Sequence, residues 1–312
     1  MQFKLLGSAV AALALISTNV YAQTDMRLEL RKKFEAELQK LNDSFDGAFG
    51  AQFVDLTDGQ KISINAENIF PTASTIKVPI LIELFRQADQ KPDLLKQQRP
   101  FNQKTGGGMA RLLGEGSSIA LEDVAKMMIN LSDNTATNIL IDELGMDSVN
   151  RLLTSLGFKQ TKLQRRMLEN TAQAKNLENI TTPAEAATIM TRIAQCELPV
   201  SKAACARIRE ILEIPQNPHP TKDPIPRNIP IAFKWGGVEG VSCGQAIVGL
   251  PDRPYVFSLM TTYGMDAAPT LRAASEAGFN YFSKLARANA YGARVPLDVI
   301  RKERPNTKPP GK

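Results

Sequence analysis

Histidine is almost absent from this sequence. Its 312 residues include one, His219, which lies in a proline-rich stretch. A histidine-based zinc site needs more than one such ligand, so zinc-dependent hydrolysis is not expected. A Ser-His-Asp triad would have to recruit this one loop residue. If the chain is a nucleophilic enzyme, its base is therefore better sought among other residue types, and lysine is one that can serve.

Blocks of one charge and long apolar runs are also lacking. The net charge of +6 is spread along the chain, without an arginine-rich block, so nucleic acid is not an expected partner. The apolar run at about residues 5–16 is short for a transmembrane helix. It follows Lys4 and precedes Val20-Tyr21-Ala22, which resembles a leader cleavage site. Residues 1–22 are therefore predicted to be a secretory leader, with an uncleaved membrane anchor as the alternative. The mature chain is expected to be periplasmic or secreted, without stable membrane insertion.

The chain has only three cysteines. Cys196 and Cys205 flank a short segment between two predicted helices, and in an oxidising compartment they would be able to pair. Two buried thiols are the alternative. Cys243 would be left over, as a small buried residue on a strand.

The patterns that are present predict strands at both ends of the chain and helices in the middle. Apolar (43%) and charged (22%) fractions are those of a globular protein, and the length is enough to bury a core. β-rich runs between turn residues predict strands at residues 48–56, 61–65, 229–235, 241–250 and 255–263. Periodicity and helix caps predict helices at about residues 26–41, 74–88, 121–130, 134–144, 147–156, 183–195, 203–212 and 267–288.

These elements predict an α/β chain of the α+β type. Its five-stranded antiparallel sheet would be built from both ends of the chain, with an all-helical lobe inserted between them. We expect residues 23–300 to form a single domain, with a sheet lobe at about 25–70 and 222–290 and a helical lobe at about 71–221. Residues 301–312 are expected to be a disordered tail. The cleft between the lobes is the expected site.

Ser74 and Lys77 form a Ser-x-x-Lys motif at the start of a predicted helix. Residues three apart share a helix face, so the hydroxyl and the amine can meet. A lysine can take the proton of a serine only if desolvation or nearby positive charge lowers its pKa. A helix start also directs free backbone N–H groups at a developing oxyanion. Alone, the motif is weak evidence, because it occurs by chance in most proteins of this size.

Two further motifs follow in the sequence. Ser132-Asp133-Asn134 lies in a turn between two predicted helices, and Lys234-Trp235-Gly236-Gly237 lies on the first strand of the C-terminal group. Each has an ordinary structural explanation, as a helix cap or a strand-edge lysine. With Ser74-x-x-Lys77, and in this order, they resemble the active-site serine penicillin-recognising enzymes, and among them the class A serine β-lactamases. The resemblance covers about residues 30–286 and implies a β-lactamase/transpeptidase-like fold.

The resemblance implies a catalytic or binding role for each matched residue. Ser74 would be the nucleophile that the lactam carbonyl acylates, and Lys77 would help to activate it. Ser132 would relay a proton to the leaving nitrogen. Asn134 would bind the side-chain amide of the substrate and help to position Lys77. Asp133 is expected mainly to hold its own turn.

The strand motif completes the implied site. Lys234 would place positive charge near Ser132 and the substrate carboxylate, and the N–H groups of Ser74 and Gly237 would form the oxyanion hole beside Gly236. The resemblance implies an exported, monomeric serine hydrolase. It would act on small-molecule β-lactams and need no metal or organic cofactor.

The loop predicted at residues 161–182 departs from the family pattern. Class A enzymes carry a Glu-x-x-x-Asn arrangement there, whose glutamate activates the water that hydrolyses the acyl-enzyme. If Asn170 is that asparagine, Arg166 stands in the place of the glutamate. Glu169 is the nearest carboxylate and would serve as the base only if the loop is shifted. Otherwise it is a solvated residue, or pairs with Arg165 or Arg166.

Two other positions also depart from the family pattern. Asn179 stands near the place of an aspartate that usually clamps this loop to an arginine. Trp235 replaces the usual threonine or serine, whose hydroxyl binds the substrate carboxylate, and offers only an indole N–H donor. If it faces the cleft, it narrows the pocket and would be able to stack on a substrate ring.

Two alternatives to a β-lactamase therefore stay open. The chain would be a penicillin-binding or peptidoglycan-directed enzyme that forms an acyl-enzyme but hydrolyses it poorly. Or it would be a non-catalytic binding module that retains the fold.

Overall fold

The computed structural model describes residues 25–299 except 103, 107 and 115. The predicted leader and the predicted tail lie outside the described residues. Five antiparallel strands form the central sheet in the order β2-β1-β9-β8-β7, which confirms the predicted sheet built from both ends of the chain. The strands are β1 (Ala48–Asp55), β2 (Lys61–Ile64), β7 (Ile231–Val238), β8 (Val241–Val248) and β9 (Tyr255–Thr262).

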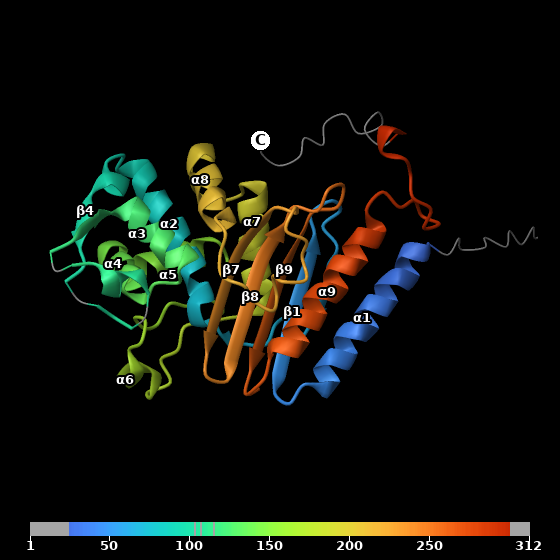
Figure 1. The fold of residues 1–312 in the computed structure, drawn as a ribbon, viewed down its shortest axis with the longest axis horizontal. Coiled ribbons are helices and arrows are strands. Elements are labelled where there is room, and N and C mark those ends of the chain that lie inside the picture. The colour runs from blue at the N-terminus through green and yellow to red at the C-terminus, as the bar shows by residue number, and fades with distance from the viewer. Residues whose placement is uncertain (1–24, 103, 107, 115, 300–312) are drawn as a thin grey trace, which may run out of the picture.

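Two helices cover one face of the sheet. α1 (Met26–Ser44) and α9 (Ala268–Leu285) lie side by side there, as Figure 1 shows. Aromatic side chains fill the space beneath them: the Phe34 ring is stacked on that of Tyr281 at 4.9 Å and meets Phe53 edge-on at 5.0 Å. This apolar layer explains the amphipathic pattern of both helices.

The other helices lie beyond the opposite face, in and next to the helical lobe (Figure 1). α2 runs through the middle of this lobe, and its residues from Lys77 to Phe85 are all buried. Asp133 caps α4 by accepting from Ala136 N, and Thr182 caps α7, whose first residue is the predicted Pro183. The helices are α2 (Lys77–Gln90), α3 (Leu121–Asn130), α4 (Asn134–Leu144), α5 (Met146–Ser155), α7 (Pro183–Gln195) and α8 (Lys202–Glu213).

The helix predicted from residue 74 begins differently. Ala73–Ile76 form a 3₁₀ turn, η1, and the α-helix starts only at Lys77. The chain enters this turn through a left-handed Ala73 (φ +43°), and the Thr75 hydroxyl donates to Thr72 O at 2.7 Å. The tight local turn thus replaces the first α-helical turn, and Ser74 lies within it.

The loop after α5 is less irregular than predicted. It contains the one-turn helix α6 (Asn170–Gln173) and the strand β6 (Ile180–Thr181), which pairs with β3 (Phe70–Pro71). Backbone pairing therefore ties the end of this loop to the segment just before Ser74. Other short elements were also missed, because two or three residues carry no periodicity: β4 (Gln98–Pro100), β5 (Ser118–Ala120), η2 (Leu94–Lys96) and η3 (Met109–Leu112).

Cys196 and Cys205 are joined in a disulfide between α7 and α8, and Cys243 is a free, buried thiol on β8. Within the described part of the chain, no helix has the length and apolarity that crossing a membrane would need.

Candidate active site

Ser74 lies where β7 touches the η1 turn. A Cβ atom added to Gly236 would lie 2.6 Å from Ser74 N and 2.9 Å from Thr72 O. Only glycine lets the strand approach the turn this closely. Gly237 is the next residue along the strand and is exposed. The sequence Lys-Trp-Gly-Gly therefore brings its second glycine to the rim of the Ser74 turn.

Lys77 connects this turn to the helical lobe. Its ammonium group donates to Ser132 O at 2.8 Å, to Ser132 Oγ at 3.1 Å and to Asn134 Oδ1 at 3.0 Å. The side chain is fully buried, and burial lowers the pKa of Lys77 to about 7, although the Asp133 carboxylate opposes this shift. A sizeable fraction of Lys77 is therefore neutral near pH 7 and can accept a proton.

Lys234 approaches the same serine from the sheet. Its Nζ donates to Ser132 Oγ at 3.2 Å and to Trp235 O at 2.8 Å. Burial, and then the neighbouring Lys77, hold the pKa of Lys234 well below its usual range. Ser132 itself has a left-handed backbone (φ +53°), a strained conformation of the kind that collects at functional sites.

Asp133 holds the turn that carries Ser132. It is fully buried, and its carboxylate accepts from Ala136 N and from Ala110 N, both at 2.9 Å. This agrees with the structural role expected for it. The structure thus brings together Lys77, Ser132, Asn134 and Lys234, with Ser74 three residues before Lys77.

Asn138 holds the loop that follows α5 against this cluster. Its side chain accepts from Met167 N at 2.8 Å and donates to Met167 O at 3.3 Å. Asn138 lies one helical turn after Asn134 on α4, so both point from the same face. Asn134 accepts a hydrogen bond from Lys77. Asn138 therefore holds the backbone of Met167 one turn of α4 further along from that hydrogen bond.

Sequence reasoning missed Asn138 and Met167. The signal that would have found them is the spacing of four residues between Asn134 and a second asparagine on the same predicted helix. Such a pair presents two amide side chains to whatever packs along that face.

Glu169 is not part of the cluster. Its side chain is exposed, and its carboxylate accepts from Arg166 N at 3.1 Å, within its own turn. The Arg166 guanidinium pairs with Asp142 instead. Among the described residues, the Glu169 carboxylate thus shares no hydrogen bond with Lys77, Ser132 or Lys234.

The clamp across the loop uses other partners than the family pattern. Arg165 pairs with Glu178 at 2.9 Å. The Asn179 side chain accepts from Gln164 N and Arg165 N at 2.7 and 3.0 Å. Thr72 N donates to Asn179 O at 2.8 Å, so this asparagine links the loop to the segment before Ser74.

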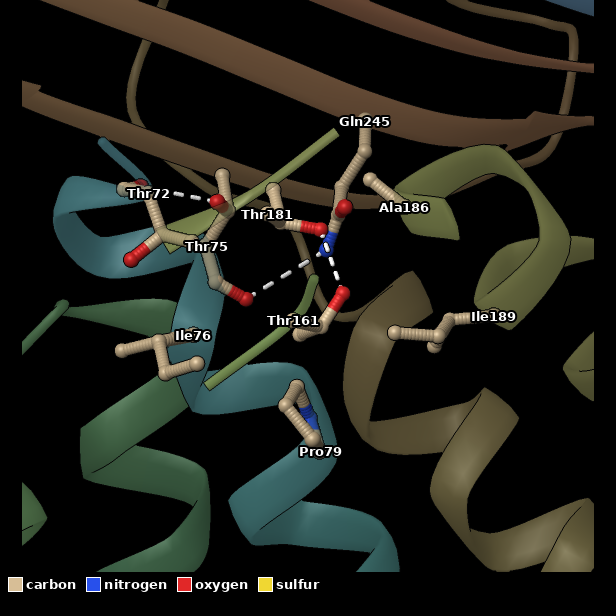
Figure 2. Close-up of a pocket in the computed structure, with 9 residues that line it drawn as sticks. All are labelled: Thr72, Thr75, Ile76, Pro79, Thr161, Thr181, Ala186, Ile189 and Gln245. Atoms are coloured by element: carbon tan, nitrogen blue, oxygen red, sulfur yellow. Dashed lines mark hydrogen bonds between the residues drawn. The ribbon is translucent and has the colours of Figure 1, made fainter. Parts of the chain in front are cut away.

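A small cavity of about 10 Å³ lies behind the Ser74 turn. Figure 2 shows Thr161 and Thr181 from the loop meeting Thr75 and Gln245 there. The two loop hydroxyls lie 2.7 Å apart, and Gln245 donates to Thr75 O at 3.4 Å. The cavity is too small for a substrate, so this is a packed polar contact that supports the turn from behind.

The half-buried Trp235 ring contacts two side chains of the protein itself. The ring of His219 is stacked on it with centroids 5.6 Å apart, and the Lys234 ammonium lies over it at 5.1 Å from the centroid. Its indole nitrogen is buried without a hydrogen-bond partner among the described residues.

Comparison with known proteins identifies relatives of this chain. The profile of the beta-lactamase enzyme family matches residues 33–285. The chain is similar to Beta-lactamase SME-1 of Serratia marcescens, with 23% identity over 72% of this chain and 80% of the relative. It is also similar to a beta-lactamase of Streptomyces fradiae, with 24% identity over 82% of this chain and 86% of the relative.

Solved structures share the fold. A beta-lactamase from Sphaerobacter thermophilus superposes with a TM-score of 0.71 and 26% identity, covering 80% of this chain and 96% of that one. PBP-A superposes with a TM-score of 0.72 and 25% identity, covering 81% of this chain and 96% of that one. A PBP-A variant with a leucine replaced by glutamate superposes equally well, at 0.72, and is an acyl-enzyme complex with penicillin G.

Proposed function

This chain belongs to the beta-lactamase enzyme family, and on that premise we propose that it hydrolyses β-lactams through an acyl-enzyme on Ser74. The observation that carries the proposal is the position of Ser132, whose hydroxyl accepts from both Lys77 and Lys234. A serine hydroxyl in this position can relay a proton, because each of the two lysines donates a hydrogen bond to its oxygen. The chain is thus a serine hydrolase that acts on β-lactam amides.

The chemistry follows from the protonation of the two lysines. Neutral Lys77 takes the proton of Ser74 as its oxygen attacks the lactam carbonyl. The N–H groups of Ser74 and Gly237 stabilise the negative charge that develops on the carbonyl oxygen by donating hydrogen bonds to it. As the ring amide bond breaks, Ser132 donates its proton to the leaving nitrogen and takes one back from the Lys77 ammonium, which donates to its hydroxyl. Charged Lys234 attracts the carboxylate of the substrate.

Mass spectrometry of the protein mixed with penicillin G tests this proposal. A mass increase of one penicillin on Ser74 is expected, followed by its loss as product forms. Ser74→Ala is expected to show neither. Lactam consumption by the Ser74→Ala variant at the wild-type rate would exclude Ser74 as the nucleophile.

We also propose that the enzyme acts after export, as one catalytic domain over about residues 23–300. The leader-like sequence at residues 1–22 and the disulfide between Cys196 and Cys205 support this, because disulfides persist in oxidising compartments. The N-terminal sequence of the protein recovered from cells tests it. An N-terminus at Gln23 is expected, and an intact Met1 would contradict cleavage.

A second candidate function is favoured by the loop. An acyl-enzyme is released by water, and water needs a base. Glu169 is exposed and bonded within its own turn, and the loop residue that Asn138 holds beside the site is Met167, which carries no base. The chain would then form an acyl-enzyme that persists, as a penicillin-binding protein does. The lifetime of the Ser74 adduct separates this candidate from rapid hydrolysis.

A non-catalytic binding module is the third candidate. The buried lysines around Ser132 argue against it, because burying two like charges costs stability and is hard to explain without chemistry. A folded protein that no penicillin labels would revive it.

A further inference from the structure

The Trp235 ring contacts two nitrogen-bearing side chains. The His219 ring is stacked against it, with an angle of 22° between the planes. The Lys234 Nζ lies over the same ring. A threonine or serine, which the family usually carries between the lysine and the glycine, would make neither contact.

His219 is held in this position by a close approach of its loop to the sheet. Gly244 is the β8 partner of Trp235, and a Cβ atom at Gly244 would lie 2.1 Å from Thr221 Oγ1. The Thr221 hydroxyl lies 2.9 Å from His219 Nδ1, and Ser275 Oγ donates to Thr221 O at 2.6 Å. The missing side chain at Gly244 thus lets Thr221 seat on the strand and fixes His219 over Trp235.

Lys234 needs a group that favours its charged form. It is fully buried, and burial and then the neighbouring Lys77 both disfavour its charged form. The charged and titratable groups around it are Lys77 on α2 and His219 in the loop before β7. Asp133 acts on Lys77, and Asp223 acts on His219. Burial lowers the pKa of His219 to about 4, so its ring is neutral at pH 7 and adds no positive charge beside Lys234.

The face of an indole ring carries negative potential and attracts a cation, most strongly where water is excluded. We propose that Trp235, fixed by His219, keeps the Lys234 ammonium charged and directed at Ser132. Both are then positioning residues for the recognition of β-lactams that bear a free carboxylate. This rests on the proposed function, and it assigns to an aromatic stack a task that a hydroxyl performs in relatives by direct contact with the substrate.

The test compares penicillin G with its methyl ester. Second-order rate constants for consumption of each are measured between pH 6 and pH 10. For Trp235→Leu, the preference for the free acid is expected to fall about tenfold, and the loss of activity at alkaline pH is expected to begin at lower pH. Trp235→Phe keeps a ring face and is expected to keep most of the preference.

His219→Leu tests the same inference from outside the strand. It is expected to lower the preference for the free acid and to shift the alkaline loss of activity to lower pH, both to a smaller extent than Trp235→Leu. If Trp235→Leu does not fold, His219→Leu replaces it in the test. Phe279→Leu is the matched control, because Phe279 packs at the edge of the same apolar cluster as Trp235. It is expected to leave the preference and the pH profile unchanged.

The two possible failures are distinguishable. If the wild-type chain consumes neither compound, the proposed function fails and this inference with it. If the wild-type chain prefers the acid while Trp235→Leu, or His219→Leu in its place, keeps the same preference and the same pH profile, the inference fails alone. A lower melting temperature with unchanged preference would leave the stack with a purely structural role and would also overturn it.

Discussion

The ammonium groups of Lys77 and Lys234 share one acceptor, the hydroxyl of Ser132, at 3.1 and 3.2 Å. Two cations rarely point at one oxygen in a buried site, because each disfavours the charged form of the other. Both lysines accordingly have lowered pKa values. The site is thereby set so that one lysine can lose its proton at neutral pH.

Acylation is predicted to depend on pH through Lys77. Its pKa in the folded protein is about 7, so the neutral fraction falls about tenfold for each pH unit below that value. The acylation rate is expected to rise by about fiftyfold between pH 5 and pH 7 and to level off above about pH 8. Stopped-flow measurement of lactam consumption gives this profile.

Lys77→Arg tests the same mechanism by introducing a side chain that has no neutral form, because arginine stays protonated. Acylation is expected to be lost at every pH from 5 to 9. A flat profile from pH 5 to pH 8 in the wild-type chain, or an active Lys77→Arg variant, would contradict a base role for Lys77.

Met167→Glu is predicted to speed the loss of the acyl-enzyme. It places a carboxylate on the loop position that Asn138 holds beside the site. General-base catalysis contributes about a hundredfold or more, so the adduct lifetime is expected to fall by about that factor. Rapid-quench mass spectrometry of the penicillin adduct measures it.

Two comparisons make the Met167→Glu result specific. Leu177→Glu adds the same charge to an exposed position of the same loop and is expected to leave the lifetime unchanged. Glu169→Gln distinguishes the remaining base candidate: a longer lifetime in that variant would identify Glu169 as the base after all. No change in Met167→Glu would mean that this position does not face the ester.

Asn138→Ala is predicted to destabilise the protein and to alter the reaction. It leaves the buried N–H and C=O of Met167 without their partners, which costs about 1–3 kcal/mol. Urea denaturation measures the loss, and the adduct lifetime measures the effect on chemistry.

Asn150→Ala is the matched control for that change. Asn150 makes the same pair of hydrogen bonds with Leu163, each at 2.9 Å, near the start of the loop. A similar loss of stability is expected, with an unchanged adduct lifetime. If both variants alter the adduct lifetime equally, the loop acts as one unit, and the position of Met167 does not by itself determine the lifetime.

Glu185 is predicted to make the stability of the loop pH-dependent. Its carboxylate accepts from the backbone N–H groups of Lys159, Gln160 and Thr161 and from the Thr161 hydroxyl. Burial raises the pKa of Glu185, but these hydrogen bonds outweigh it, and the pKa is lowered below 4.5. A lowered folded pKa adds stability that is complete above pH 4.5 and is lost as the pH falls through the folded pKa.

Glu185→Gln measures this contribution. The variant is expected to be less stable than the wild type in urea at pH 7, and the difference is expected to shrink towards pH 3. A difference that is constant with pH would show that the ionised carboxylate adds nothing beyond what an amide supplies.

Much of the fold could be predicted from local signals. Asp133 and Gly145 mark the two ends of α4, and Thr182 with Pro183 marks the start of α7, because helix caps depend on residues next to each other in the chain. The shift from helical to alternating patterns marks the C-terminal strands in the same way. The close contact between the Ser74 turn and Gly236 could not be predicted, because the two lie far apart along the chain.

The same distinction between local patterns and distant contacts applies to the residues of the site. The motif residues were identified because their spacing is short and their order is fixed. The surroundings of Trp235 depend on Gly244 and Thr221, which lie far from each other along the chain and touch only in the folded sheet. The register of the loop depends on Asn138, which no pattern within the loop reveals, and so the sequence pointed to Glu169 and Arg166 rather than to Met167.

The pairing of β1 with β9 has a consequence for how the active site comes into existence. Ala51 pairs with Leu259, so the sheet closes only after the two ends of the chain have met across the inserted lobe. Contacts this distant in sequence form slowly. Gly236, which lies against Ser74, is on the edge strand β7 of this same sheet. Covalent labelling of Ser74 is therefore expected to report completed folding, and a chain whose sheet has not yet assembled is expected not to react.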